Sequence, residues 1–246
     1  MSSSVIEIQN LSKSFGTNHV LRNFSMSVME GKNLVILGKS GSGKSVLIKC
    51  IISLIAPDDG SIKIFGNDIS NYSSDDLDEL RARIGFLFQS NALYDSMSVR
   101  ENLEFPLRRH WNKEQREKGA ERAVMEVLED VGLPHTVDMM PSELSGGMRK
   151  RIALARTLIL HPSIILYDEP TTGLDPITAR EISHLIVQVQ KKYNATAIII
   201  SHDMNCIQIT SNSVIMLIDG TRYAQDTYAN LQRYEDPKIH EFFSIN

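Results

Sequence analysis

The stretch Leu34-Val35-Ile36-Leu37-Gly38-Lys39-Ser40-Gly41-Ser42-Gly43-Lys44-Ser45 decides the fold. Its four apolar residues predict a central strand that is covered on both faces. The loop that follows matches the pattern G-x-x-x-x-G-K-[ST], and Val46–Leu54 reads as a helix. Glycines let such a loop curl until its backbone N–H groups face one point, and the helix N-terminus adds partial positive charge there. The stretch therefore predicts an α/β protein that binds the phosphates of a nucleotide.

Within this loop, Lys44 is expected to reach the β- and γ-phosphates, and the Ser45 hydroxyl is expected to bind Mg²⁺. The remaining residues of the cradle are Gly38, Lys39, Ser40, Gly41, Ser42 and Gly43. A plain Gly/Ser-rich turn is the alternative, and the strand before and the helix after count against it. Because many unrelated nucleotide hydrolases share the pattern, it indicates no more than a nucleotide phosphate site.

A second apolar strand, Ile164–Tyr167, ends in two acids, Asp168 and Glu169. Asp168 is expected to hold Mg²⁺ directly or through its water. Glu169 would face the γ-phosphate and accept a proton from the attacking water, because water is a poor nucleophile that must be oriented and deprotonated. A strand that ends in a polar turn is common, so this pair gains its weight from the phosphate loop.

Composition limits the class of protein. The chain has 246 residues, 42% of them hydrophobic, and a net charge of −4. This balance gives no basic footprint for nucleic acid, and the short basic run Arg149–Arg151 is predicted to be a solvated helix face. Cys50 and Cys206 are predicted to be buried free thiols in a reducing compartment. With no secretory signal and no apolar run of membrane length, a cytoplasmic protein is expected, peripheral on the cytosolic face of the inner membrane if it serves a membrane process.

The pattern along the chain predicts one domain, residues 1–246. An N-terminal β part contains Val5–Ile8 and Phe24–Val28, and Gly60–Gly66 is a further strand. From about residue 91 to 160, strand patterns give way to helical spacing, as in Lys113–Val131, which predicts an α-helical insertion. Further along lie a predicted helix, strand and hairpin turn, at Pro176–Lys192, Thr196–Ile200 and Ile218–Thr221.

The third motif, Leu144-Ser145-Gly146-Gly147-Met148 before a helix, resembles the LSGGQ signature of ABC ATPases. The other motifs of that family follow in order over nearly the whole chain. Phe15 resembles the aromatic that stacks on adenine, and Gln89 resembles the Q-loop glutamine. Thr172–Asp175 resembles the D-loop, and His202 the switch histidine. Alone, Gln89 would read as a surface residue and His202 as a structural histidine.

The resemblance implies an ATPase of the P-loop NTPase class, with a mixed or parallel core sheet, an N-terminal antiparallel part and a helical insertion. It implies ATP and Mg²⁺ as cofactors, with Gln89 as a further Mg²⁺ ligand, Glu169 as the general base and His202 on the γ-phosphate. It also implies that Ser145, Gly146, Gly147 and Met148 complete the ATP site of a second copy, so the expected state is a head-to-tail homodimer.

Two stretches narrow the resemblance. Leu144–Arg151 (LSGGMRKR) and Gln89–Val99 (QSNALYDSMSV) look like the ATPases of MCE-linked lipid transporters, the MlaF/Mkl-like group. Met148 stands where the usual pattern has Gln, and a thioether cannot donate the hydrogen bonds of an amide. The likeness implies an integral membrane permease, an MCE-domain lipid-binding protein and a small regulatory subunit as partners in phospholipid transport. A soluble ABC ATPase that drives assembly of a protein complex, as in iron–sulfur assembly, stays open.

Overall fold

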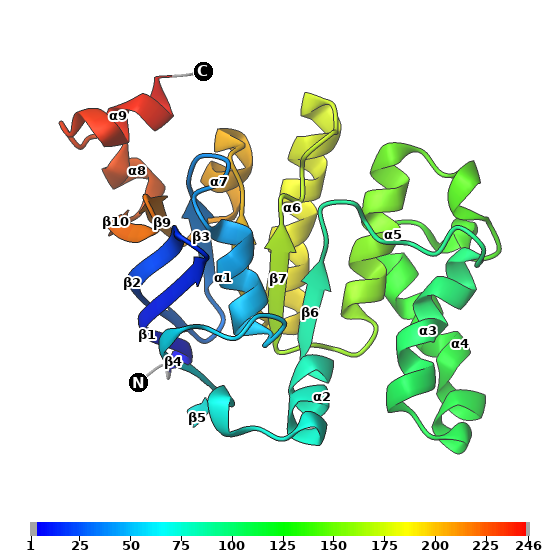
Figure 1. Ribbon diagram of the computed structural model, residues 1–246. Helices are drawn as coiled ribbons and strands as arrows, with labels where there is room; N and C mark the ends of the chain where they lie inside the picture. The colour runs from blue at the N-terminus through cyan, green and yellow to red at the C-terminus, as the bar shows by residue number, and fades with distance from the viewer. Residues whose placement is uncertain (1–3, 245–246) are drawn as a thin grey trace.

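Two β-sheets organise the molecule, whose computed structural model describes residues 4–244 (Figure 1). The first is antiparallel, with the strand order β2-β1-β4-β5. The second is mixed, with the order β10-β9-β3-β8-β7-β6, and is parallel from β9 to β6. The bounds of the strands are β1 Ser4–Phe15, β2 Asn18–Met29, β3 Asn33–Leu37, β4 Asp59–Ile64, β5 Asn67–Asp68, β6 Ile84–Leu87, β7 Ile164–Asp168, β8 Thr196–Ile200, β9 Ser213–Ile218 and β10 Thr221–Asp226.

The parallel strands are continuous apolar runs because both of their faces are covered. Along β3, Leu34 and Ile36 face a core shared with the antiparallel sheet and helix α1 (Lys44–Ile51). Val35 and Leu37 face a second core, which the remaining large helices cover. The neighbouring strands β7 and β8 alternate in the same way. Because these strands are parallel neighbours, their carboxyl ends meet at one edge of the sheet.

Three helices lie between β6 and β7 in the sequence and form a block beside the sheet (Figure 1). They are α3 (Val99–His110), α4 (Lys113–Asp130) and α5 (Gly146–Leu158). Asn112 begins α4 with a reciprocal side-chain cap, and the predicted apolar face packs inward through Val124, Val127 and Leu128. The other helices are α2 Ser74–Ala82, α6 Pro176–Tyr193, α7 Met204–Thr210, α8 Tyr228–Leu231 and α9 Pro237–Phe243, with 3₁₀ turns at Ile69–Asn71, Pro134–Thr136 and Pro141–Glu143.

Two local expectations were wrong. The helix predicted at Val46–Leu54 begins at Lys44 and ends at Ile51, since the left-handed backbone of Gly43 starts it directly after the loop. The basic run Arg149–Arg151 is not a uniformly solvated face, because Lys150 is buried with only 2% of its surface exposed. Cys50 and Cys206 are buried free thiols, as predicted. Within residues 4–244, no helix has the length and apolar character that crossing a bilayer requires.

Candidate nucleotide site

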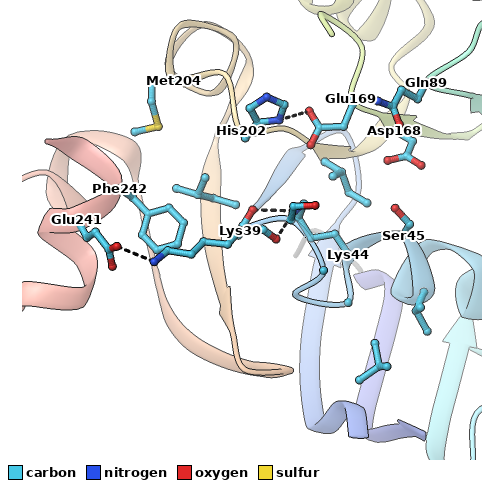
Figure 2. Close-up of a pocket in the computed structure, with 18 of the residues that line it drawn as sticks. Lys39, Lys44, Ser45, Gln89, Asp168, Glu169, His202, Met204, Glu241 and Phe242 are labelled. Atoms are coloured by element: carbon cyan, nitrogen blue, oxygen red, sulfur yellow. Dashed lines mark hydrogen bonds and ion pairs between the residues drawn. The ribbon is translucent and has the colours of Figure 1, made fainter. Parts of the chain in front are cut away.

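A cavity of about 840 Å³ opens at the edge where β3, β7 and β8 end (Figure 2). Because β8 lies between β3 and β7, the loops after these strands converge although they are far apart in sequence. The cavity gathers most of the residues that the sequence singled out. Its lining includes Phe15, Gly38, Lys39, Ser40, Gly41, Gly43, Lys44, Ser45, Gln89, Asp168, Glu169 and His202.

The phosphate loop is shaped by its glycines. Gly41 and Gly43 have φ values of +78° and +103°, which L side chains rarely adopt. A Cβ on Gly43 would lie 2.8 Å from the Val20 carbonyl oxygen, so the loop admits no side chain there. Lys44 is buried and donates hydrogen bonds to the carbonyls of Gly38 (2.7 Å) and Lys39 (2.9 Å). A concave loop closed by a buried cation fits the phosphates of a nucleotide.

The acids beside the loop balance this cation. Burial lowers the pKa of Lys44, and the carboxylates of Glu169 and Asp168 oppose that shift. Burial raises the pKa of Asp168, as does the neighbouring Glu169 carboxylate, whereas the Lys44 ammonium and the nearby Ser45 hydroxyl act in the opposite direction. The Ser45 hydroxyl and the Asp168 carboxylate are thus adjacent oxygen donors of the kind that Mg²⁺ prefers, so these residues fit the ion.

Glu169 and His202 lie side by side in the cavity and contact each other (Figure 2). The His202 Nδ1 lies 2.8 Å from the Glu169 Oε2, and Thr172 donates to the same oxygen at 3.4 Å. Glu169 has a φ of +51°, a strained backbone for a residue with a side chain, and its N–H is held by the Ile200 carbonyl. The end of β8 thereby fixes the turn that directs the carboxylate into the cavity.

Phe15 ends β1 and leaves half of its surface exposed, so it is not a core aromatic. Lys13 places its ammonium 5.4 Å from the centre of the Phe15 ring. The lining also includes residues that the sequence reasoning missed, among them Met204, Glu241 and Phe242. The Glu241 carboxylate pairs with Lys39 at 2.6 Å (Figure 2). No local pattern marks these residues, because only the folding of α9 back onto the loop brings them there.

The signature residues lie elsewhere. Ser145 is the N-cap of α5, and its Oγ accepts a hydrogen bond from the Met148 N–H at 3.2 Å. A Cβ on Gly147 would lie 2.7 Å from the Thr178 side chain, so α5 packs closely on the start of α6. Among the described residues that line the cavity there is none from 145–148. Figure 1 accordingly shows α5 and α1 on either side of β6 and β7.

A phosphate loop follows the buried parallel strand β3, and an acid pair follows β7, which is separated from β3 by β8 alone. Together with a helical block whose last helix, α5, begins with Ser-Gly-Gly, these features define the ATPases of the ATP-binding cassette class. The chain belongs to the ABC transporter family, whose model matches residues 21–172, more than half of the chain.

Several relatives are similar over most of this chain. The probable ribonucleotide transport ATP-binding protein Mkl of Mycobacterium leprae is 42% identical over 86% of the chain, which spans 60% of the length of that relative. The intermembrane phospholipid transport system ATP-binding protein MlaF of Haemophilus influenzae is 37% identical over 98% of the chain and 91% of MlaF. The Escherichia coli MlaF is 36% identical over 97% of the chain and 88% of its own length.

Solved structures show the same fold. The dimeric, post-hydrolysis ATP-binding cassette MJ0796 bound to ADP and Pi superposes with a TM-score of 0.82 and 29% identity, over 91% of this chain and 98% of that one. CbiO1 of Clostridium perfringens, part of the ABC transporter complex CbiONQ, gives a TM-score of 0.85 with 28% identity, over 98% of this chain and 99% of that one.

Proposed function

We propose that this chain is the ATP-hydrolysing subunit of an ABC transporter and works as one half of a head-to-tail dimer. This proposal rests on the observation that one cavity of the chain holds some of the expected ATP-site residues but not the signature residues. The phosphate loop, both acids and His202 share one cavity, whereas Ser145–Met148 lie outside it. A second copy would supply the missing residues, and the similar cassette MJ0796 is a dimer in its ADP-bound structure.

Each cavity residue then has a task. The exposed ring of Phe15 stacks on adenine, and Gly38–Ser45 cradle the phosphates. Ser45, Gln89 and Asp168 would hold Mg²⁺, which would neutralise part of the phosphate charge. Glu169 accepts the proton of the attacking water, and His202 binds the γ-phosphate. Their 2.8 Å contact keeps base and phosphate ligand at one point of the cavity.

The signature residues act on the ATP of the other subunit. The Ser145 Oγ accepts the Met148 N–H, so its own proton is free to be donated to a phosphate oxygen. The Gly146 and Gly147 N–H groups open the same helix, where the helix dipole favours an anion. Each charge-assisted hydrogen bond to the γ-phosphate contributes ~1.5–3 kcal/mol, so loss of that phosphate releases several contacts together and opens the dimer. Because Ser145, Gly146 and Gly147 make these contacts, we expect activity to survive although Met148, which packs against the core, has no amide.

The cargo proposed is phospholipid moved between membranes, driven through a permease on the cytosolic face of the inner membrane. The MlaF relatives, which cover nearly the whole chain, support this assignment. A surface for the permease adjoins Gln89: Phe88, Tyr94 and Phe105 are exposed, and the rings of Tyr94 and Phe105 lie 4.8 Å apart. An MCE-domain protein and a small regulatory subunit complete the proposed complex.

Affinity purification of the tagged chain from detergent-solubilised membranes tests this proposal. A multi-span permease, an MCE-domain protein and phospholipid should co-purify with the wild type. Tyr94→Asp should lose the permease, whereas the control Leu54→Asp, which changes an exposed apolar residue elsewhere, should retain it. Recovery of soluble partners alone would instead support an ATPase that drives assembly of a protein complex. A permease that carries ribonucleotides would refute the phospholipid assignment.

A further inference from the structure

Lys150 is a buried cation for which the proposed chemistry has no use. It lies in α5, near the Ser145 N-cap, and its Nζ donates a hydrogen bond to the Gln89 carbonyl at 3.0 Å. Burial lowers its pKa, and the Asp168 carboxylate is the charge that opposes this shift. Removing a cation from water costs several kcal/mol, and an apolar side chain of the same volume avoids that cost. Stability alone therefore does not explain a lysine at this position.

A second cation of helix α5 contacts the residues that closely follow Gln89. Arg156 donates to the carbonyls of Asn91 (3.1 Å) and Ala92 (2.8 Å). Both acceptor residues have left-handed backbones, with φ values of +64° and +53°. Asparagine adopts this conformation readily, whereas the Cβ of Ala92 disfavours it, so the Ala92 conformation persists only where the surroundings hold it. Two side chains of one helix thus fix three carbonyls of the segment 89–92.

The end of the segment is fixed to α3 in the same manner. Asn102 is fully buried, and its Oδ1 accepts the Tyr94 N–H at 2.8 Å. Its Nδ2 donates to the carbonyls of Tyr94 and Met97. The strand β6, just before Gln89, instead pairs with β7 in the sheet. The boundary between the sheet and the helical block therefore falls at Phe88, directly before Gln89.

We propose that Lys150 is a positioning residue that ties the Gln89 backbone to α5, so that the Gln89 side chain and the Ser145 N-cap move as one body. The consequence for catalysis rests on the proposed ATPase function. A ligand that engages Gln89 in one cavity would thereby orient the Ser145 end of the same helix, which serves the other cavity of the dimer.

Amide hydrogen exchange of the nucleotide-free protein tests whether Lys150 holds the Gln89 backbone to α5. This measurement does not depend on ATP hydrolysis. The N–H groups of Asn91 and Tyr94 donate to the Phe88 carbonyl and to Asn102, so they report opening of the segment. Lys150→Met should accelerate their exchange at least about tenfold, since one charge-assisted bond is lost. Lys150→Gln, which keeps a donor, should restore most of the protection. Unchanged exchange in Lys150→Met would overturn the proposal.

Arg151→Met is the matched control. Arg151 is a cation of the same helix that donates to the Val131 carbonyl and to Glu181, away from the segment. Its replacement should leave the exchange of Asn91 and Tyr94 unchanged. If Arg151→Met accelerated their exchange as much as Lys150→Met does, the effect of Lys150 would be a general loss of stability, and the positioning role would be refuted. Should Lys150→Met fail to fold, Arg156→Met tests the neighbouring hydrogen bonds from α5 to the carbonyls of Asn91 and Ala92. It should accelerate the same amides, and unchanged exchange would again overturn the proposal.

Turnover provides the second readout. Lys150→Met should lower kcat for ATP at least about tenfold and leave KM within about threefold, because the phosphate loop and Phe15, to which most of the nucleotide contacts are assigned, are unchanged. A rise in KM at constant kcat would show a binding role and contradict positioning. If the wild type itself shows no turnover, the ATPase proposal fails, and the exchange experiment still decides whether Lys150 fixes the segment.

Discussion

Replacing Glu169 with Gln isolates the proton-accepting role of this residue. The amide has the shape of the carboxylate, so the contacts with His202 (2.8 Å) and Thr172 (3.4 Å) can be retained. The left-handed turn at this position is set by the backbone bond to Ile200 and does not depend on the side-chain charge. The substitution therefore removes the base and leaves the cavity in place.

A general base contributes roughly 10²–10⁴-fold to a rate, which corresponds to ~2.7–5.4 kcal/mol of activation free energy. We expect kcat of Glu169→Gln to fall by that factor, whereas KM for ATP stays within about threefold of wild type, because the lost interaction acts in the transition state. Steady-state phosphate release at saturating ATP measures both. The exposed Glu235→Gln serves as the control. Turnover of Glu169→Gln at the wild-type rate would refute the assignment of Glu169 as the base.

Three further predictions concern the charges and thiols of the fold. Lys44→Ala should lose ATP affinity and turnover together, and unchanged affinity in a fluorescent-nucleotide titration would contradict the phosphate assignment. Asp168→Asn should raise the melting temperature of the nucleotide-free protein at pH 7, because the folded pKa of Asp168 is raised above 3.8 and its ionised form is the destabilised one. The gain should vanish below the ordinary carboxyl pKa, where wild-type Asp168 is protonated in both states, and an equal gain at both pH values would contradict this origin. Cys50 and Cys206, whose pKa burial raises to about 11, should resist a thiol reagent at pH 8 until the protein unfolds, and rapid labelling of the native chain would contradict their burial.

The sequence predicted those elements whose burial produces a local pattern of apolar and capping residues. The run Leu34–Leu37 shows that both faces of β3 are covered, and Asp175-Pro176 marks the start of α6. The hairpin turn between Ile218 and Thr221 also carries its own signal. The order of the strands in the sheet produces no local pattern, because β3, β8 and β7 lie side by side in the sheet but β3 is far from the other two in the sequence. The meeting of Lys44, Asp168 and His202 was therefore expected from the family resemblance and not from spacing.

Features that depend on tertiary contacts could not be predicted. Lys150 lies in a basic run typical of a solvated face, and only the packing of α5 on the Gln89 segment buries it. Glu241 and Phe242 reach the cavity because α9 folds back toward the phosphate loop. The end of α1 at Ile51 was also missed, since the apolar pattern continues to Leu54, which the fold leaves exposed.

The central claim is that two copies close around ATP through the signature residues. Light scattering on the Glu169→Gln protein, with and without ATP and Mg²⁺, tests it most directly. The account predicts one chain per particle without nucleotide and two with ATP, and it predicts that adding Ser145→Arg to the same protein abolishes the ATP-dependent doubling. A particle of one chain at saturating ATP, or doubling that survives Ser145→Arg, would contradict the proposed dimer.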